Sequence, residues 1–203
     1  MKYRSFKGVP WRVLGSAYGS PLRVARRFDG LEDCHEDLRG DFFCGDLCSD
    51  AFHQYTVYTG TSAIMRMVIE ALDNDSLCSA NDCFGSPMCL RFLQFLGYCT
   101  KAGWAIGLWP FVPSTKQVLI EGESQFIRFS KHESEEVAEE ASHLLELVGQ
   151  FKEQEASRRA MTMMWKLLSW KYGMIPAACL ATASLGYLVS RILQFDLLES
   201  LWL

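Results

Sequence analysis

Apolar residues recur at helical spacing in three segments between residues 62 and 173. In the first, residues 62–74, the apolar side chains follow one another at intervals of one, three and four, which is the pattern of one face of an α-helix. They are Ile64, Met67, Val68, Ala71 and Leu72. We predict a helix that starts at Ser62, a residue type that caps helices, and stops at Asp73–Asp75.

The second segment, residues 87–109, is apolar or small at nearly every position. Pro87 suits the first turn of a helix, and a helix that is apolar on all sides is typically the buried centre of a bundle. We therefore predict a hydrophobic central helix here. The stretch that follows, residues 110–129, predicts a loop with one strand or hairpin, whose turn lies at Glu121 and Gly122.

The third segment, residues 130–173, carries two apolar stripes on either side of the polar residues 152–159. Ser130 and Glu133 have the spacing of a capping box, and the glutamates that follow suit the positive end of a helix dipole. We predict a helix that begins at Ser130. Its first stripe is Val137, Ala141, Leu144, Leu145, Val148 and Phe151, and its second is Met161, Met164, Trp165 and Leu168.

Residues 1–60 have short apolar groups with Gly, Pro and Asp scattered among them, and β-type residues only near residues 51–58. The fold class expected from the whole pattern is mostly α: a helical bundle around a hydrophobic central helix, with an irregular N-terminal arm and a hydrophobic C-terminal helix. The expected organisation is an irregular region over 1–60, a helical domain over 61–172 and a hydrophobic tail over 173–203.

The tail has no charged residue between Met174 and Ser190, a length at the short edge of a membrane-spanning helix. Arg191 could snorkel to the interface and extend that length. We expect the tail to associate with a membrane. The competing interpretation is a core helix, because an amphipathic stretch follows Arg191. The expected membrane-contacting residues are Ile175, Leu180, Leu185, Leu188 and Val189.

Charge is unevenly distributed along a chain of 203 residues whose net charge is −4. Residues 1–28 hold seven basic residues and no acid, whereas residues 29–50 hold eight acids and only Arg39. The basic start suits an organelle presequence or an arm on anionic lipid. The alternative is an arm that folds back on the acidic segment. The low net charge argues against a nucleic-acid partner.

Cysteine and histidine supply the only metal-like cluster in the sequence. No apolar stretch follows the first basic residues, so we expect no secretion signal and reduced thiols. Cys34, Cys44, Cys48 and His53 could together hold one zinc ion. The sequence nevertheless lacks the usual zinc-binding pair of two cysteines with two residues between them. The chain also has no phosphate-binding loop and no nucleophile elbow. We expect a non-enzyme without a cofactor, with a cysteine-nucleophile enzyme as a lesser alternative.

Two stretches resemble the Bcl-2 family of apoptosis regulators. "TGTSAIMRMVIEALDND" followed by "CFGSPMCLRFLQFLGYCTKAGW" is similar to that family's amphipathic helix, turn and buried central helix, and "ATASLGYLVSRI" resembles its tail anchors. The family's Trp-Gly-Arg is replaced by Gly85-Ser86-Pro87, and Arg91 lies one turn later. Divergent viral members of the family lose the same motifs.

The resemblance implies a function in binding. A groove between the helices at 62–74 and 87–103 would accept an amphipathic helix of a protein partner. Its expected contact residues are Val68, Leu72, Leu90, Arg91 and Phe95, of which the four apolar ones are alternatively plain core residues. The implied function is a non-enzymatic factor that regulates apoptosis at an intracellular membrane, such as the mitochondrial outer membrane, or otherwise in the cytoplasm. The alternative is a soluble helical adaptor with the zinc site.

Overall fold

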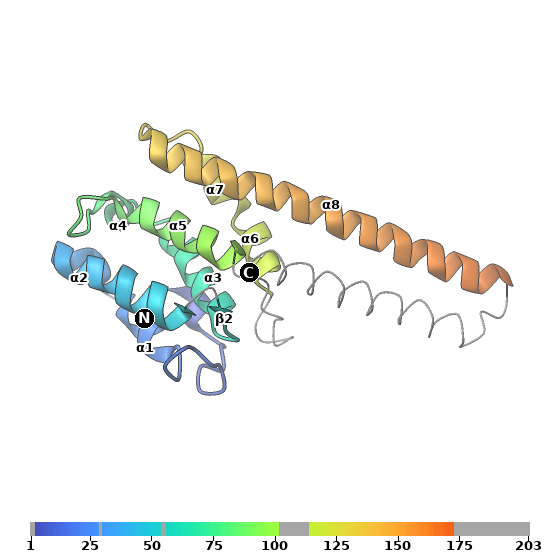
Figure 1. Cartoon of the computed structure of the whole chain (residues 1–203), viewed down its shortest axis with the longest axis horizontal. Helices are drawn as coiled ribbons and strands as arrows, with labels where there is room; N and C mark the ends of the chain where they lie inside the picture. Colours follow the sequence, from blue (N-terminus) through green and yellow to red (C-terminus); the bar gives the residue numbers. More distant parts are fainter. Residues whose placement is uncertain (1–2, 29, 54–55, 102–113, 173–203) are drawn as a thin grey trace, which may run out of the picture. The chain divides into compact units, whose positions relative to one another are not determined.

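The computed structural model describes residues 3–28, 30–53, 56–101 and 114–172, and these residues are mostly α-helical (Figure 1). The predicted fold class, a helical bundle around a hydrophobic helix, is confirmed for this part of the chain. The chain divides into two compact units, Met1–Glu153 and Gln154–Leu203. The division falls within the last described helix and does not coincide with the boundaries expected at residues 60 and 172.

The elements up to residue 57 are short. They are η1 (Arg4–Phe6), α1 (Leu22–Arg27), η2 (Leu31–Asp33), α2 (Glu36–Asp41), the π-helical η3 (Phe42–Ala51), and the antiparallel strands β1 (Phe52–His53) and β2 (Thr56–Val57). The helices that follow are α3 (Thr61–Ala71), α4 (Asp75–Ser79), α5 (Met88–Lys101), α6 (Thr115–Glu121), α7 (Glu123–Phe129) and α8 (Glu135–Tyr172).

Helix α5 is the hydrophobic centre of the first unit. It packs against η3, α3, α4 and α6 (Figure 1). Its apolar side chains point in several directions around the helix, so they are enclosed by different neighbours. Met88, Phe92, Leu93, Phe95, Leu96 and Cys99 have no exposed surface. The predicted central helix is confirmed.

Residues before 60 belong to the same core, which corrects the expectation of an irregular arm. The ring of Phe28 meets Phe42 edge-on, with centroids 4.8 Å apart, and lies 6.1 Å from the ring of Phe92 in α5. Arg23 and Arg27 of α1 pair with the buried carboxylate of Asp46 in η3. The basic segment therefore folds back on the acidic one at these residues. Elements of three to ten residues are too short for helical periodicity to reveal them.

Residues 115–129 form the helices α6 and α7, so the expected strand or hairpin was wrong. Val118 and Phe126 are fully buried on these two helices. The turn lies at Gly122, as predicted, but it joins two helices. A Cβ atom at Gly122 would lie 2.8 Å from both Ile69 Cδ1 and Phe126 Cζ, so a larger residue there would have to displace the ends of these two side chains.

Two predicted helix starts are displaced. Helix α3 begins at Thr61 after Gly60, and Ser62 is buried inside it. Helix α8 begins at Glu135, because Ser130 ends α7 instead, where its N–H donates to Phe126 O. A serine that precedes an apolar stripe has the sequence pattern of an N-terminal cap whether it lies at the start of that helix, inside it or at the end of the helix before. Only the packing of α7 decides which helix end Ser130 serves.

The first apolar stripe of α8 is buried except for the half-buried Leu145, whereas Met161, Met164 and Trp165 of the second stripe are exposed. Val137, Ala141, Leu144 and Val148 have no exposed surface, and Phe151 is 5% exposed. Lys116 of α6 lies over the Phe151 ring, 5.0 Å from its centroid. The polar stretch 152–159 continues the same helix without a break.

Gly149 of α8 offers a test of the first unit's helical packing. A Cβ atom there would meet nothing within 4 Å. Since glycine is a poor residue for a helix interior, Gly149→Ala should raise the free energy of unfolding by about 0.5–1 kcal/mol, measured by urea denaturation. The matched control is Gly60→Ala, whose Cβ would lie 2.5 Å from Pro21 Cγ and 2.9 Å from Gly15 O, and which should destabilise. Loss of stability in Gly149→Ala would contradict an exposed helical position.

Candidate functional site: the expected groove and the exposed end of α8

The four apolar residues expected to line a binding groove are core residues. Val68, Leu72 and Phe95 have no exposed surface, and Leu90 is 4% exposed. Their side chains pack in one cluster contributed by α3 and α5. A partner helix could touch them only if these two helices separated. These four residues therefore have the alternative role given above: they are core residues, and they do not line a groove in this structure.

The fifth expected contact residue, Arg91, already pairs with a carboxylate of its own chain. Arg91 Nε donates to Asp82 Oδ2 at 2.7 Å, and Asp82 has a fully buried side chain. The other oxygen, Asp82 Oδ1, accepts from the backbone N–H groups of Phe84 and Ser86, both at 2.9 Å. The guanidinium also lies over the rings of Phe43 and Phe84. Through Asp82, these contacts hold the loop that precedes α5 against Arg91 of α5.

The pKa of Asp82 reflects that arrangement. Burial raises the pKa of its carboxyl, but the hydrogen bonds from Ser86, Arg91 and Phe84 favour the charged form and outweigh the burial. The net pKa lies below its usual value. Asp82 is therefore ionised at neutral pH and compensates the charge of Arg91, so an incoming carboxylate would have to displace it.

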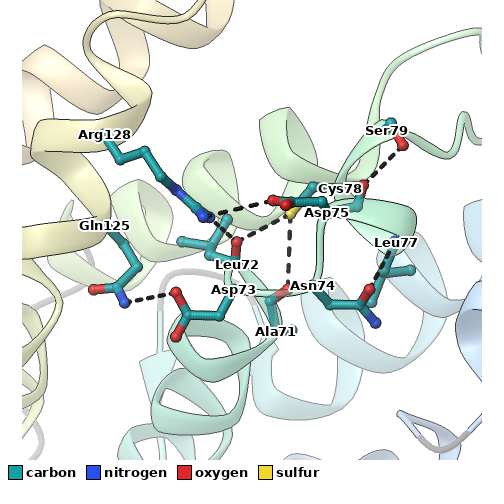
Figure 2. Close-up of polar contacts among 10 residues, drawn as sticks. All are labelled: Ala71, Leu72, Asp73, Asn74, Asp75, Leu77, Cys78, Ser79, Gln125 and Arg128. Atoms are coloured by element: carbon teal, nitrogen blue, oxygen red, sulfur yellow. Dashed lines mark hydrogen bonds and ion pairs between the residues drawn. The ribbon is translucent and has the colours of Figure 1, made fainter.

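The turn between α3 and α4 is tied to α7 by polar contacts. Figure 2 shows Arg128 and Gln125 of α7 reaching this turn. Arg128 donates to the carbonyl oxygen of Leu72 and lies 3.5 Å from a carboxylate oxygen of Asp75. Gln125 Nε2 donates to Asp73 Oδ1 at 3.0 Å. Moving α3 away from the bundle would break these polar contacts as well as the apolar core packing. Both kinds of interaction therefore keep the expected groove between α3 and α5 closed.

The cysteine thiols close to this turn and to η3 are poor thiolate formers. Burial raises the pKa of Cys78 to about 12, and its thiol donates to the carbonyl oxygens of Ala71 and Leu72 (Figure 2). Burial, with the nearby Cys44 as a lesser cause, raises the pKa of Cys48 to about 12. Arg91 near Cys48 and Arg128 near Cys78 lower these pKa values, but burial outweighs them, and since the thiolate is the nucleophile, neither position is activated.

The structure describes the side chains of three of the four expected zinc ligands. Cys34 is half-buried and its thiol donates to Gly30 O, Cys44 is exposed and Cys48 is half-buried. The side chain of His53 lies outside the described residues. Within the part of the chain that the structure describes, no group of three His, Cys, Asp or Glu side chains is placed to hold a metal ion. The complete four-ligand set stays a prediction.

Three pockets open on the described surface of the first unit, and the expected groove residues line none of them. One, of about 590 Å³, is bordered by charges of both signs, and its Arg66 and Glu121 already pair with each other at 2.9 Å. Another, of about 470 Å³, lies beside Cys78 and Cys89. The third, of about 590 Å³, is bordered mainly by polar and charged side chains next to Glu70. None of the three gathers groups that point to a particular ligand.

The expected membrane residues Ile175, Leu180, Leu185, Leu188 and Val189 lie outside the described residues. No helix within residues 3–172, so far as these are described, has the length and apolar character needed to cross a bilayer. The structure nevertheless shows an apolar surface directly before the tail in sequence. We call residues 156–167 of α8 the Met-Trp segment.

The Met-Trp segment exposes five large apolar side chains within seven residues. Met161 is 57% exposed, Met163 68%, Met164 53%, Trp165 44% and Leu167 61%. Three of its residues are basic, and none is acidic. The sequence pattern placed Met161, Met164 and Trp165 in a second apolar stripe and did not indicate whether that stripe is buried or exposed. The sequence signal that could have indicated the exposed surface is the change of charge after Glu155, the last acidic residue of the helix.

The Met-Trp segment is amphipathic. At 3.6 residues per turn, Arg158, Thr162, Arg159 and Lys166 fall within one sector of the helix, and the exposed apolar side chains occupy the remaining surface. Arg159 also pairs with Glu155 at 3.2 Å, one turn earlier, in a solvent-exposed ion pair that contributes little stability. A broad apolar face with a basic polar face is the pattern of a helix that lies in a membrane interface.

No protein-family model, curated protein or solved structure matches this chain. The resemblance to the Bcl-2 family therefore stays an expectation from residues 59–75, residues 83–104 and the tail.

Proposed function

We propose that this protein is a non-enzymatic interaction factor that acts at an intracellular membrane, with the Met-Trp segment as its membrane-contacting element. The observation that carries the proposal is the exposure of Met161, Met163, Met164, Trp165 and Leu167 on consecutive turns of one helix. Contiguous apolar surface of this kind marks an interaction site, because leaving it in water costs free energy. The uncharged tail at 174–190 follows within seven residues in sequence and would add a second apolar contact with the same membrane.

The Bcl-2 resemblance supports the remainder of the proposal: regulation of cell death through an amphipathic helix of a protein partner. Such a partner would bind either outside the closed core or after α3 separates from α5. The second route carries a free-energy cost, since Val68 and Phe95 would lose their packing and Arg128 its bond to Leu72 O. The membrane part of the proposal does not depend on this route.

Flotation of the full-length chain with phospholipid vesicles tests the proposal. We expect the chain to rise with the vesicles. Met161→Gln combined with Trp165→Gln should lower the vesicle-bound partition coefficient about tenfold or more, since each side chain contributes about 1 kcal/mol or more when buried in lipid.

The matched control makes two substitutions to glutamine at exposed polar positions of the same helix: Ser142→Gln, which lies outside the Met-Trp segment, and Thr162→Gln, which lies in its polar sector. This control should float like the unaltered chain. An intact chain that remains at the bottom of the gradient with every vesicle would refute the membrane proposal. Equal flotation of both double variants would show that the Met-Trp segment is not the contact.

A further inference from the structure

We infer that the Met-Trp segment recognises anionic phospholipid headgroups through Arg158, Arg159 and Lys166, so that the chain selects negatively charged bilayers. This inference rests on the proposed membrane function and adds the class of lipid to it. The carrying observation is that three basic residues share a helix with five exposed apolar side chains, and no acid lies among them.

The charge along α8 changes sign abruptly. Between residues 130 and 155 the sequence holds eight glutamates, and between residues 156 and 195 it holds no acidic residue. The basic residues of that second stretch are Arg158, Arg159, Lys166, Lys171 and Arg191. A solvated helix face ordinarily mixes both signs, as α8 does before residue 156, where Lys152 lies among the glutamates. The exclusion of acids coincides with the beginning of the exposed apolar surface, so one ligand accounts for both features.

The positions of the cations suit a planar anionic surface. Arg159 and Lys166 are seven residues apart, which places them on the same side of the helix, separated by about 10 Å along its axis. Arg158 lies at the other margin of the polar sector, beyond Thr162. Long basic side chains at the margins of an apolar face can snorkel, so that their stems cover apolar surface while their charges reach phosphate groups.

A bilayer fits this surface better than a macromolecule does. Nucleic acid would neutralise the cations but would leave Met163 and Leu167 in water. A protein groove typically accepts a narrow stripe with anchors at i, i+3, i+4 and i+7, whereas here the apolar residues extend over more than half of the helix circumference. Trp165 adds an amphipathic ring of the type that concentrates at membrane interfaces. The apolar surface therefore points to lipid, and the cations point to an anionic one.

The size of the effect follows from the charge count. A basic residue near an anionic membrane surface favours binding about fivefold, so three together favour it roughly 100-fold. The ion pair of Arg159 with Glu155 reduces this figure without removing it, because that pair is solvent-exposed. Added salt should weaken the preference further, since screening shortens the reach of the surface potential.

The experiment compares flotation of the full-length chain with vesicles of phosphatidylcholine alone and of phosphatidylcholine mixed with phosphatidylserine. We expect binding to both, with a preference for the mixed vesicles that disappears in Arg158→Gln/Arg159→Gln/Lys166→Gln while binding to phosphatidylcholine persists. The matched control removes the same charge from exposed positions of the first unit, Lys7→Gln/Arg12→Gln/Arg26→Gln, and should keep the preference. Circular dichroism establishes that each variant is folded.

Each other outcome has a distinct meaning. Equal binding of the unaltered chain to both vesicles overturns the anionic-lipid inference and leaves the proposed membrane function standing. Absence of binding to either vesicle refutes the proposed function itself. A preference that survives in the α8 variant, or that is lost only in the control, also overturns the inference, and the latter result assigns the contact to the basic N-terminal segment.

Discussion

Phe95→Ala is expected to lower the free energy of unfolding by about 3–5 kcal/mol. Phe95 has no exposed surface and lies in α5, the helix around which the first unit packs. Truncating its ring removes apolar contacts and leaves a cavity that rigid helices fill only partly. Chemical denaturation followed by circular dichroism measures the change. If the variant is too unstable to purify, Phe95→Leu should show a smaller loss in the same direction.

Phe84→Ala is the matched control, since it makes the same substitution at a ring that is 68% exposed. It should cost about 1 kcal/mol or less, mostly from losing the contact of the Phe84 ring with the Arg91 guanidinium. The comparison separates a core residue from a groove wall. If Phe95→Ala kept full stability and lost only partner binding, Phe95 would be a groove residue and the closed core would be wrong.

Asp82→Ala is expected to lower the free energy of unfolding by about 3 kcal/mol or more. It leaves Arg91, whose side chain is only 17% exposed, without its counter-charge. It also leaves the N–H groups of Phe84 and Ser86 without their acceptor. Removing one partner of a buried pair is costly because the remaining charge stays in a poorly solvated site. Denaturant unfolding of the variant measures the loss.

Two controls separate the charge from the hydrogen bonds. Asp82→Asn keeps an oxygen that can accept from the loop N–H groups, so it should be destabilised less than Asp82→Ala. Glu123→Ala breaks an ion pair with Lys152 in which both side chains are more than a third exposed, and it should cost less than about 1 kcal/mol. Equal losses in Asp82→Ala and Glu123→Ala would contradict the special role of the buried pair.

The lowered pKa of Asp82 also gives its stabilisation a pH dependence. A carboxyl whose pKa is lower in the folded state stabilises the fold above its unfolded pKa, near 4, and this contribution is lost as the pH falls through the folded pKa. The unaltered chain should therefore lose more stability than Asp82→Asn on acidification below about pH 4. Parallel losses would show that Asp82 does not carry the effect.

The candidate site was predicted only in part, and the reason is geometric. The sequence identified α3 and α5 as amphipathic and central helices, but an apolar side chain on such a helix lines a groove or fills a core equally well. Leu72 and Phe95 became core residues because α7 holds the α3–α4 turn through Arg128 and because α5 is enclosed on several sides. Arg128 and Leu72 are 56 positions apart, and the elements around α5 come from both sides of it in the chain, so one sequence has no local signal for these contacts.

The Met-Trp segment is the opposite case: its apolar residues are exposed, although their spacing is equally compatible with burial. Phe151 and Trp165 belong to apolar stripes of similar spacing, yet the ring of Phe151 is 5% exposed and that of Trp165 is 44% exposed. Periodicity indicates that a helix has an apolar face. Whether that face is covered depends on tertiary packing: Phe151 is buried, and among residues 152–167 none is buried.

The sequence alone determined the mostly helical class, the position of the central helix and the turns at residues 73–75 and 122, because these depend on local periodicity and on residues that break helices. Tertiary structure alone decided that residues before 60 join the core, that 115–129 is helical, and that Arg91 is bound to Asp82. Each of these depends on free energy gained between distant segments: ring packing between Phe28 and Phe92, close approach at Gly122, and the pairing of a buried charge.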